Sequence, residues 1–347
     1  MEQVYEVLVH TEDSQGLKSY LEKMITAIDS EFVFSEYDEI ESAIDVLNDG
    51  ESDLILLDGN TWHQIKNKGG IIAAVLPRRE PTLVMVSEDK PEYLPSKAIV
   101  SADGELVKRQ IQRLREDLAL TDSLSLGIAN YDAQNKIEEL ESKRNSGEID
   151  AHICTREEHA KLSTRSRRHT LGFQRETDDR QGFIPPALGG FAILLARKGF
   201  PVASIVDLND QAAQIELVTE SAIFDQVKKE LREITGVNVQ LRRVSAIMRE
   251  AEKRGDEAVK DGLLDFEGVL IRKGKRLHMC METLSYDGKV TARAERIVPI
   301  DDANLGIIRL LEEHATLVEL LTSDIEAHPR HGEAAPSMMN LDSHSSS

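Results

Sequence analysis

The groups that could do covalent chemistry in this chain begin with its thiols, and these are scarce. The sequence has two cysteines, Cys154 and Cys280. A thiolate can act as a nucleophile or a metal ligand, but two isolated cysteines make neither a disulfide framework nor a zinc site. We therefore interpret both as small apolar residues buried in the fold. This usage is typical of a reducing compartment, and we expect the protein in the cytoplasm.

Basic and imidazole side chains gather in two places. One is a cluster around His169, which is compatible with an anion site or with an exposed loop: Arg165, Arg167, Arg168 and Arg175. We favour the loop, because no interleaved aromatic residues or glycine-rich cradle accompany the cluster. The other place is the C-terminal tail, whose histidines lack a repeated ligand spacing and so predict a solvated segment and no metal site: His328, His331 and His344.

The overall charge limits the partners. The chain of 347 residues has 42 basic and 62 acidic residues, a net charge of -20. Such a surface repels the phosphates of nucleic acids and of anionic lipids, so we expect neither as a partner. No apolar run reaches the length of about 18 residues that a membrane helix needs, and the acidic start predicts no secretory signal.

The elements that must position any site follow an α/β pattern. β-rich runs at 4–9, 53–57 and 71–76 predict strands, and apolar spacing predicts helices at 17–28 and 215–234. The length exceeds what one hydrophobic core usually holds. We predict domains over 1–98, 99–189 and 210–322, followed by a disordered tail over 323–347.

Several short segments match one family in their order along the chain. They lie between residues 53 and 296: Asp53 and Ala73-Ala74-Val75-Leu76-Pro77-Arg78, Val107-Lys108-Arg109-Gln110, Gly147-Glu148-Ile149-Asp150-Ala151, Ile184 to Arg197, Leu208-Asn209-Asp210, Thr219-Glu220-Ser221-Ala222, and Ser285-Tyr286-Asp287-Gly288 with Ala294-Glu295-Arg296. Together they resemble the hydroxymethylbilane synthase (porphobilinogen deaminase) family. The resemblance implies an α/β fold of two domains like type 2 periplasmic binding proteins plus a smaller α/β C-terminal domain. It also implies that a segment near 190–208 returns to the first domain.

The resemblance further implies a transferase of tetrapyrrole and porphyrin biosynthesis that polymerises porphobilinogen with release of ammonia. That chemistry needs an aspartate in the cleft and a cysteine that carries a dipyrromethane cofactor. The aspartate position is Thr61 here, and a local shift would be needed for Asp58 to replace it. The cysteine position is Val237 or Leu263, depending on the register, so we expect no covalently attached dipyrromethane.

Arginines that bind substrate carboxylates in the family correspond here to Lys108, Arg109 and Lys136, the substrate-binding residues that the resemblance predicts. Lysine keeps the charge but lacks the planar guanidinium fork. A further arginine position is occupied by Glu12, which would repel a polycarboxylate. An ordinary solvated helix face explains the three basic residues equally well.

Two functions follow. One is a divergent hydroxymethylbilane synthase that binds a tetrapyrrole precursor, and the other is a catalytically inactive paralogue that acts as a binding or regulatory protein. Because both required groups are replaced, the chemistry favours the second, and we predict no catalytic residue. A receiver-like signalling protein, suggested by the strand-like segment from Asp53 to Asp58, would leave most of the chain unexplained.

Overall fold

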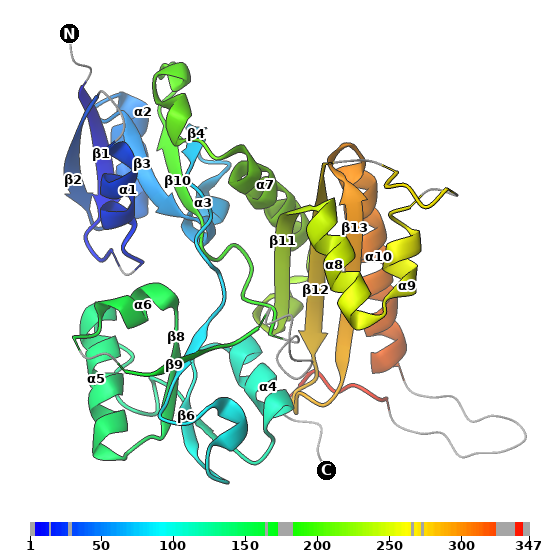
Figure 1. The fold of residues 1–347 in the computed structure, drawn as a ribbon. Helices are drawn as coiled ribbons and strands as arrows, with labels where there is room; N and C mark the ends of the chain where they lie inside the picture. Colours follow the sequence, from blue (N-terminus) through cyan, green and yellow to red (C-terminus); the bar gives the residue numbers. More distant parts are fainter. Residues whose placement is uncertain are drawn as a thin grey trace, which may run out of the picture.

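The computed structural model describes residues 4–13, 15–26, 30–163, 166–172, 183–264, 267–271, 274–323 and 337–342. These residues form three β-sheets with helices packed on them (Figure 1). The mixed α/β class predicted from the sequence is therefore confirmed. Within these ranges, no helix combines the length and apolar character needed to cross a membrane.

The first sheet has the strand order β2-β1-β3-β10-β4. Its strands are β1 (Val4–His10), β2 (Glu31–Tyr37), β3 (Leu54–Asp58), β4 (Ile71–Val75) and β10 (Ala192–Ala196). β1 is parallel to both β2 and β3, whereas β10 enters antiparallel between β3 and β4. Every residue of β10 is buried, as the apolar run at this point in the sequence predicts for a central strand.

Helices cover both faces of the first sheet. They are α1 (Leu17–Ile25), α2 (Ile40–Asp49) and α3 (Gly59–Ile65). Leu21 of α1 packs against one face, and α2 and α3 pack against the other through Leu47 and Trp62. This arrangement leaves the carboxyl ends of β1, β2 and β3 together at one edge of the sheet.

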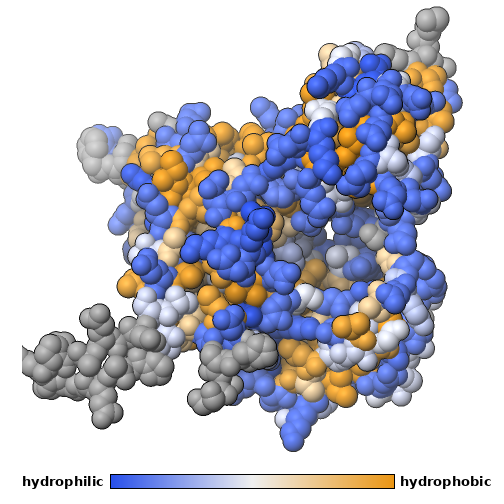
Figure 2. Space-filling view, turned by 180° about the vertical axis from the view of Figure 1, so that it is seen from behind, coloured by the Kyte–Doolittle hydropathy of each residue, from blue (hydrophilic) through white to orange (hydrophobic). Residues whose placement is uncertain are grey.

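The second sheet has the order β7-β6-β8-β5-β9. Its strands are β5 (Val84–Val86), β6 (Ile99–Ser101), β7 (Ala119–Thr121), β8 (Ala151–Cys154) and β9 (Arg168–Thr170). Its helices are η1 (Pro91–Tyr93), α4 (Glu105–Leu114), α5 (Ala133–Ser146) and α6 (Arg156–Lys161). The chain passes between the first two sheets twice, after β4 and again before β10. Figure 2 shows a hollow between these two parts of the molecule on a face rich in hydrophilic side chains.

The third sheet is antiparallel, with the order β11-β12-β13. Its strands are β11 (Thr235–Arg243), β12 (Lys275–Leu284) and β13 (Thr291–Pro299). Around it lie η3 (Val202–Leu208), α7 (Gln211–Gln226), η4 (Lys229–Ile234), α8 (Val244–Arg254), α9 (Glu257–Asp261), η5 (Ile300–Asp302) and α10 (Ala303–Thr322). The single helix predicted over 215–234 is wrong: α7 ends at Gln226, because Val227 adopts an extended conformation.

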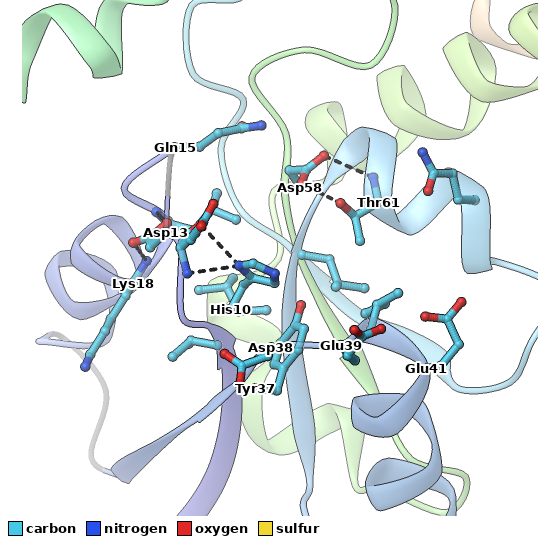
Figure 3. Close-up of a pocket in the computed structure, with 17 residues that line it drawn as sticks. His10, Asp13, Gln15, Lys18, Tyr37, Asp38, Glu39, Glu41, Asp58 and Thr61 are labelled. Atoms are coloured by element: carbon cyan, nitrogen blue, oxygen red, sulfur yellow. Dashed lines mark hydrogen bonds between the residues drawn. The ribbon is translucent and has the colours of Figure 1, made fainter. Parts of the chain in front are cut away.

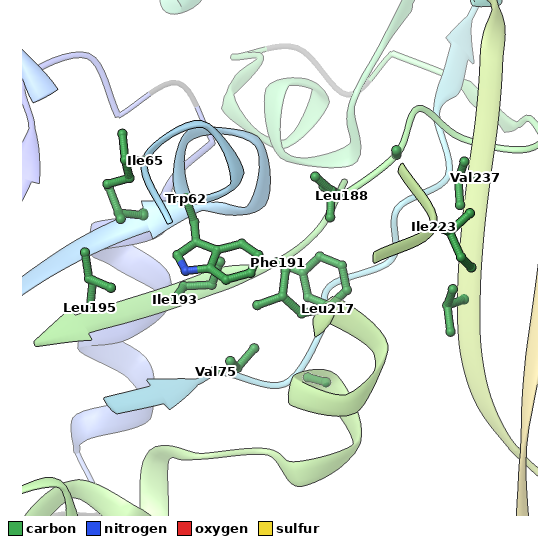
Figure 4. Close-up of a cluster of buried hydrophobic side chains, with 14 of the residues drawn as sticks. Trp62, Ile65, Val75, Leu188, Phe191, Ile193, Leu195, Leu217, Ile223 and Val237 are labelled. Carbon is green, nitrogen blue, oxygen red and sulfur yellow. The ribbon is translucent and has the colours of Figure 1, made fainter. Parts of the chain in front are cut away.

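A shared core joins the first and third sheets. Trp62 from α3, Phe191, Leu217 from α7 and Val237 from β11 belong to one buried cluster (Figure 4). The predicted domain limits at 98, 189 and 210 stay a prediction. In the predicted tail, residues 324–336 and 343–347, with His328, His331 and His344, lie outside the described residues. Residues 337–342 are instead placed against the fold, and Met339 is buried, so the predicted disorder does not extend over them.

Candidate functional site

A cavity of about 440 Å³ lies at the carboxyl edge of the first sheet, where β1, β2 and β3 end (Figure 3). Its lining comes from three strand ends and the segments that follow them: Val9, His10, Glu12, Asp13, Gln15, Leu17, Lys18, Tyr37, Asp38, Glu39, Ile40, Glu41, Leu56, Leu57, Asp58, Thr61 and Gln64. We call this cavity the strand-end pocket.

The pocket lies where strand order reverses. After β1 the chain runs through α1 on one face of the sheet, and after β3 it runs through α3 on the other. These connections diverge from neighbouring parallel strands and leave a crevice between them. Ligands of open α/β sheets bind in such crevices, at the carboxyl ends of the strands.

Two aspartates build the walls of the pocket. The Asp58 carboxylate caps α3 by accepting from Asn60 N–H (2.8 Å) and Thr61 N–H (3.0 Å), and it also accepts from Thr61 Oγ1 (2.7 Å). Asp13 accepts from the backbone N–H groups of Leu17 (2.6 Å) and Lys18 (3.0 Å), at the start of α1. Both carboxylates are therefore fixed by N–H groups at helix starts, where negative charge is favoured.

The pocket is strongly acidic. Six carboxylates occur among its lining residues: Glu12, Asp13, Asp38, Glu39, Glu41 and Asp58. Lys68 pairs with Glu41 (2.9 Å) and lowers the pKa of that carboxyl. Burial, and then the Asp58 carboxylate, raise the pKa of Tyr37 to about 12, so this phenol stays neutral.

Little positive charge offsets these acids inside the pocket. The Lys18 ammonium lies 5.5 Å from the centre of the Phe34 ring, and Figure 3 shows its side chain extending away from the cavity. The His10 ring packs edge-on against Tyr37, with 5.2 Å between ring centroids. The pocket therefore presents a net negative charge to a ligand, although Lys68 pairs with one of its six carboxylates, Glu41.

Residues from the second sheet approach the rim of the pocket. The Lys161 ammonium of α6 donates to the backbone oxygen of Asp13 (2.7 Å), and the Arg79 guanidinium donates to the backbone oxygen of Gln15. Arg79 also lies 3.7 Å from the Glu157 carboxylate of α6. The loop between β1 and α1 is thus held by α6 and by the segment that connects β4 to β5.

The residues predicted at the catalytic positions have different surroundings. Thr61 lies in the strand-end pocket and supports the cap of α3. Val237 is fully buried in β11, and Leu263 is buried beside α8 and α9. The two aliphatic residues are core residues of the third part of the molecule.

The three basic residues predicted to bind substrate each have an acidic partner. Lys108 lies 2.6 Å from Asp122, and Lys136 lies 2.6 Å from Asp103. Arg109 is only 5% exposed and pairs with Glu105 (2.8 Å). These contacts assign a structural role to each residue. Their role in binding a substrate stays an untested prediction.

The cysteines are buried and unpaired, which confirms their interpretation as core residues. Burial raises the pKa of both thiols, that of Cys280 to about 12. In the predicted basic cluster, Arg167 and Arg168 enter or flank β9, whereas Arg165 and Arg175 lie outside the described residues. Over the part of the chain that the structure describes, no group of histidines, cysteines and acids has the arrangement of a metal site.

Sequence reasoning missed most of the strand-end pocket. Asp38 and Glu39 follow β2, a strand that the sequence analysis did not predict, and His10 ends β1. A usable signal was present, because acids lie at or just after the end of each of the three strands: Glu12 and Asp13 after β1, Asp38 after β2, and Asp58 at the end of β3. Because the carboxyl ends of parallel strands meet at one edge of a sheet, these acids could have been predicted to line one site.

Comparisons with solved structures find binding proteins, but with low sequence identity and low TM-scores. No protein-family model and no curated protein matches the chain. A zinc-bound ligand-binding component of an ABC-type import system from Staphylococcus aureus shares 11% identity and a TM-score of 0.33, over 65% of this chain and 76% of that one. A putative methionine-binding lipoprotein from Bacillus subtilis shares 11% identity and a TM-score of 0.35, over 61% and 92%. The periplasmic aliphatic sulphonate binding protein of Escherichia coli shares 12% identity and a TM-score of 0.33, over 74% and 75%.

The predicted membership of the hydroxymethylbilane synthase family, and with it the role in tetrapyrrole biosynthesis, was wrong. No family model and no curated protein supports the synthase, and the three solved structures named above are binding or ligand-binding proteins. The matching segments have a local explanation. Gly147-Glu148-Ile149-Asp150-Ala151, for example, contains the left-handed glycine that ends α5 and the first residue of β8. Such a helix end and strand start recur in unrelated α/β proteins.

Proposed function

We propose that this chain is a small-molecule-binding protein and that its ligand is a small organic cation held in the strand-end pocket. The observation that carries the proposal is the set of six carboxylates around one cavity, with the Lys18 ammonium turned toward Phe34. A binding or regulatory role was also the second of the two functions considered from the sequence.

Size and electrostatics support a small cationic ligand. The cavity volume of about 440 Å³ falls in the range of ordinary small-molecule sites, roughly 300–1,000 Å³. Carboxylates that are already fixed by helix-start N–H groups lose little freedom when a ligand binds. An ammonium or guanidinium group would satisfy the negative charge of the pocket, whereas an anion would be repelled.

We also propose that the first two sheets correspond to the paired domains of a type 2 periplasmic binding protein. In support, the chain passes between them twice, and β10 returns antiparallel into the first sheet. The pocket then belongs to the side of the first sheet that the second sheet's Lys161 reaches.

The test is a titration with three molecules of matched length: putrescine, its neutral diol analogue butanediol and the dicarboxylate succinate. We expect putrescine to raise the melting temperature and to give a saturable heat signal by calorimetry, with a chelator present to exclude metal effects. Butanediol and succinate should do neither. Equal responses to all three, or no response to putrescine, would rule out a cation site.

A pair of matched variants locates the binding. Asp38→Asn with Glu39→Gln removes two pocket charges, and Glu22→Gln with Asp301→Asn removes two exposed charges elsewhere. Each carboxylate contributes on the order of 1 kcal/mol to the binding of a cationic group about 4 Å away in a well-hydrated pocket. The pocket variant should therefore bind putrescine at least about tenfold more weakly, and the control variant should bind like the parent.

A further inference from the structure

The last described segment of the chain, residues 337–342, contacts the fold at Leu321, Tyr286 and Arg109. We call this segment the C-terminal clip and the surface that these three residues form the groove. Two adjacent methionines show how closely it is held. Met339 is 1% exposed, whereas Met338 is 59% exposed. A methionine side chain adapts well to an irregular apolar pocket. Met339 is therefore the anchor of the clip, and Met338 points to solvent.

Backbone hydrogen bonds fix the clip on both sides of Met339. The Met339 N–H donates to the Leu321 carbonyl at the end of α10 (2.8 Å). The Tyr286 N–H donates to the Asn340 carbonyl (2.7 Å), and Arg109 Nη2 donates to the Leu341 carbonyl (3.1 Å). Three separate elements therefore hydrogen-bond to the main chain of the clip: α10, the β12–β13 turn and α4.

Arg109 connects these elements. Besides Leu341, its guanidinium donates to the Leu284 carbonyl (2.9 Å) and to Glu105 (2.8 Å), and it lies 5.7 Å from the centre of the Tyr286 ring. One buried cation on α4 therefore holds both the end of β12 and the clip.

The groove lies at the junction between the second and third sheets. At this junction the β12–β13 turn meets the backbone of α4: a side chain at Gly288 would come within 2.4 Å of the Arg109 carbonyl. Arg113 of α4 also pairs with the fully buried Glu282 of β12 (3.1 Å). The clip covers the edge of this junction and adds α10 to it.

We propose that this groove is a peptide-binding surface, and that the C-terminal clip is its ligand within the same chain, fastening the β12–β13 turn to α4. The groove fits a short peptide with an unbranched apolar anchor residue, whose own N–H donates to the Leu321 carbonyl. The next two carbonyls of the peptide accept from the Tyr286 N–H and from Arg109. Because the clip is tethered to α10, it binds at a high effective concentration, and a free peptide of the same sequence binds more weakly.

The first experiment compares Met339→Asp with Met338→Asp in the full chain by amide hydrogen exchange. Met339→Asp places a charge at a buried position (1% exposed), whereas Met338→Asp places the same charge at an exposed one (59%). In Met339→Asp the Tyr286 amide should exchange at least about tenfold faster, because the amide loses its acceptor. Met338→Asp should match the parent, and protected amides in β12 report that the third sheet is folded. Should Met339→Asp fail to fold, Met339→Ala replaces it with the same expectation.

The second experiment adds a synthetic peptide of residues 337–342 to the Met339→Asp chain. Restored protection of the Tyr286 amide by the parent peptide and by its Met338→Asp form, but not by its Met339→Asp form, supports the proposal. The proposal is overturned if Tyr286 exchanges alike in Met339→Asp and Met338→Asp. It is also overturned if the peptide restores no protection at about 1 mM, the order of effective concentration that a short tether provides.

Discussion

The ion pair between Arg78 and Glu220 gives the sharpest stability prediction for this fold. Glu220 of α7 is completely buried, and Arg78 follows β4. Their contact is bidentate, with Nη1 to Oε2 at 3.0 Å and Nη2 to Oε1 at 3.1 Å. The guanidinium also lies 4.0 Å from the centre of the Phe191 ring. The pair thus joins the first sheet to the helix that supports the third.

Removing the Arg78 guanidinium leaves Glu220 and Glu216 without their cationic partner. Glu220 still accepts from the N–H groups of Leu188 and Val239, but burial raises its pKa, and Arg78 is the main influence that lowers it. Glu216 lies 4.0 Å from Arg78 and is also mostly buried. Breaking one partner of a buried pair costs about 3–5 kcal/mol, so we expect Arg78→Met to lower the free energy of unfolding by that amount.

The same variant should show a particular pH dependence. Without Arg78, burial raises the folded-state pKa of Glu220 further above its unfolded value. The folded state then binds the proton more tightly, so stability is present below the unfolded pKa and is lost as the pH rises toward the folded one. Burial already raises the folded-state pKa of Glu220 in the parent. Relative to the parent, Arg78→Met should therefore lose about 1.4 kcal/mol per pH unit only between the parent's folded-state pKa and the higher one of the variant.

Urea denaturation followed by circular dichroism, at several pH values, measures both effects. Arg197→Met is the matched control, because it breaks a more exposed pair with Asp53 (3.1 Å; 35% and 24% exposed) and should cost about 1 kcal/mol or less. A loss below about 1 kcal/mol for Arg78→Met, or a loss independent of pH, would refute the reasoning.

Three further predictions concern a histidine, a glycine and the thiols. Burial lowers the pKa of His314 to about 4, so the parent should lose about 3 kcal/mol of stability as the pH falls from about 6.5 toward 4; denaturation of His314→Gln should lack this component, and identical pH profiles would contradict it. Gly288 has φ +70° and no space for a side chain, whereas Gly127 has φ +73° and open space; Gly127→Ala should cost about 1 kcal/mol and Gly288→Ala clearly more, and equal losses would count against the contact with α4. Cys154 and Cys280 are buried, with raised thiol pKa values, so a thiol reagent should label them only as fast as the protein opens; immediate labelling of the folded protein would disprove their burial.

Local patterns in the sequence predicted much of the secondary structure and part of the core. The runs at 4–9, 53–57 and 71–76 correspond to β1, β3 and β4, and the run before Arg197 forms the buried β10. Both cysteines were correctly interpreted as buried. The same local patterns misled at larger scale, because helix ends and strand starts such as Gly147 to Ala151 resemble those of a family to which the comparisons give no support.

The sequence by itself determined the α/β class, the acidic charge and the burial of short apolar runs, because these follow from residue type and from spacing along a helix or strand. Only the tertiary structure decided which residues meet. Asp13, Asp38 and Asp58 share a pocket because β1 lies between β2 and β3. Met339 is buried and Met338 exposed because the clip meets α10, Tyr286 and Arg109 at one place. Strand order and the docking of distant segments depend on the packing of the whole chain, which no local pattern encodes.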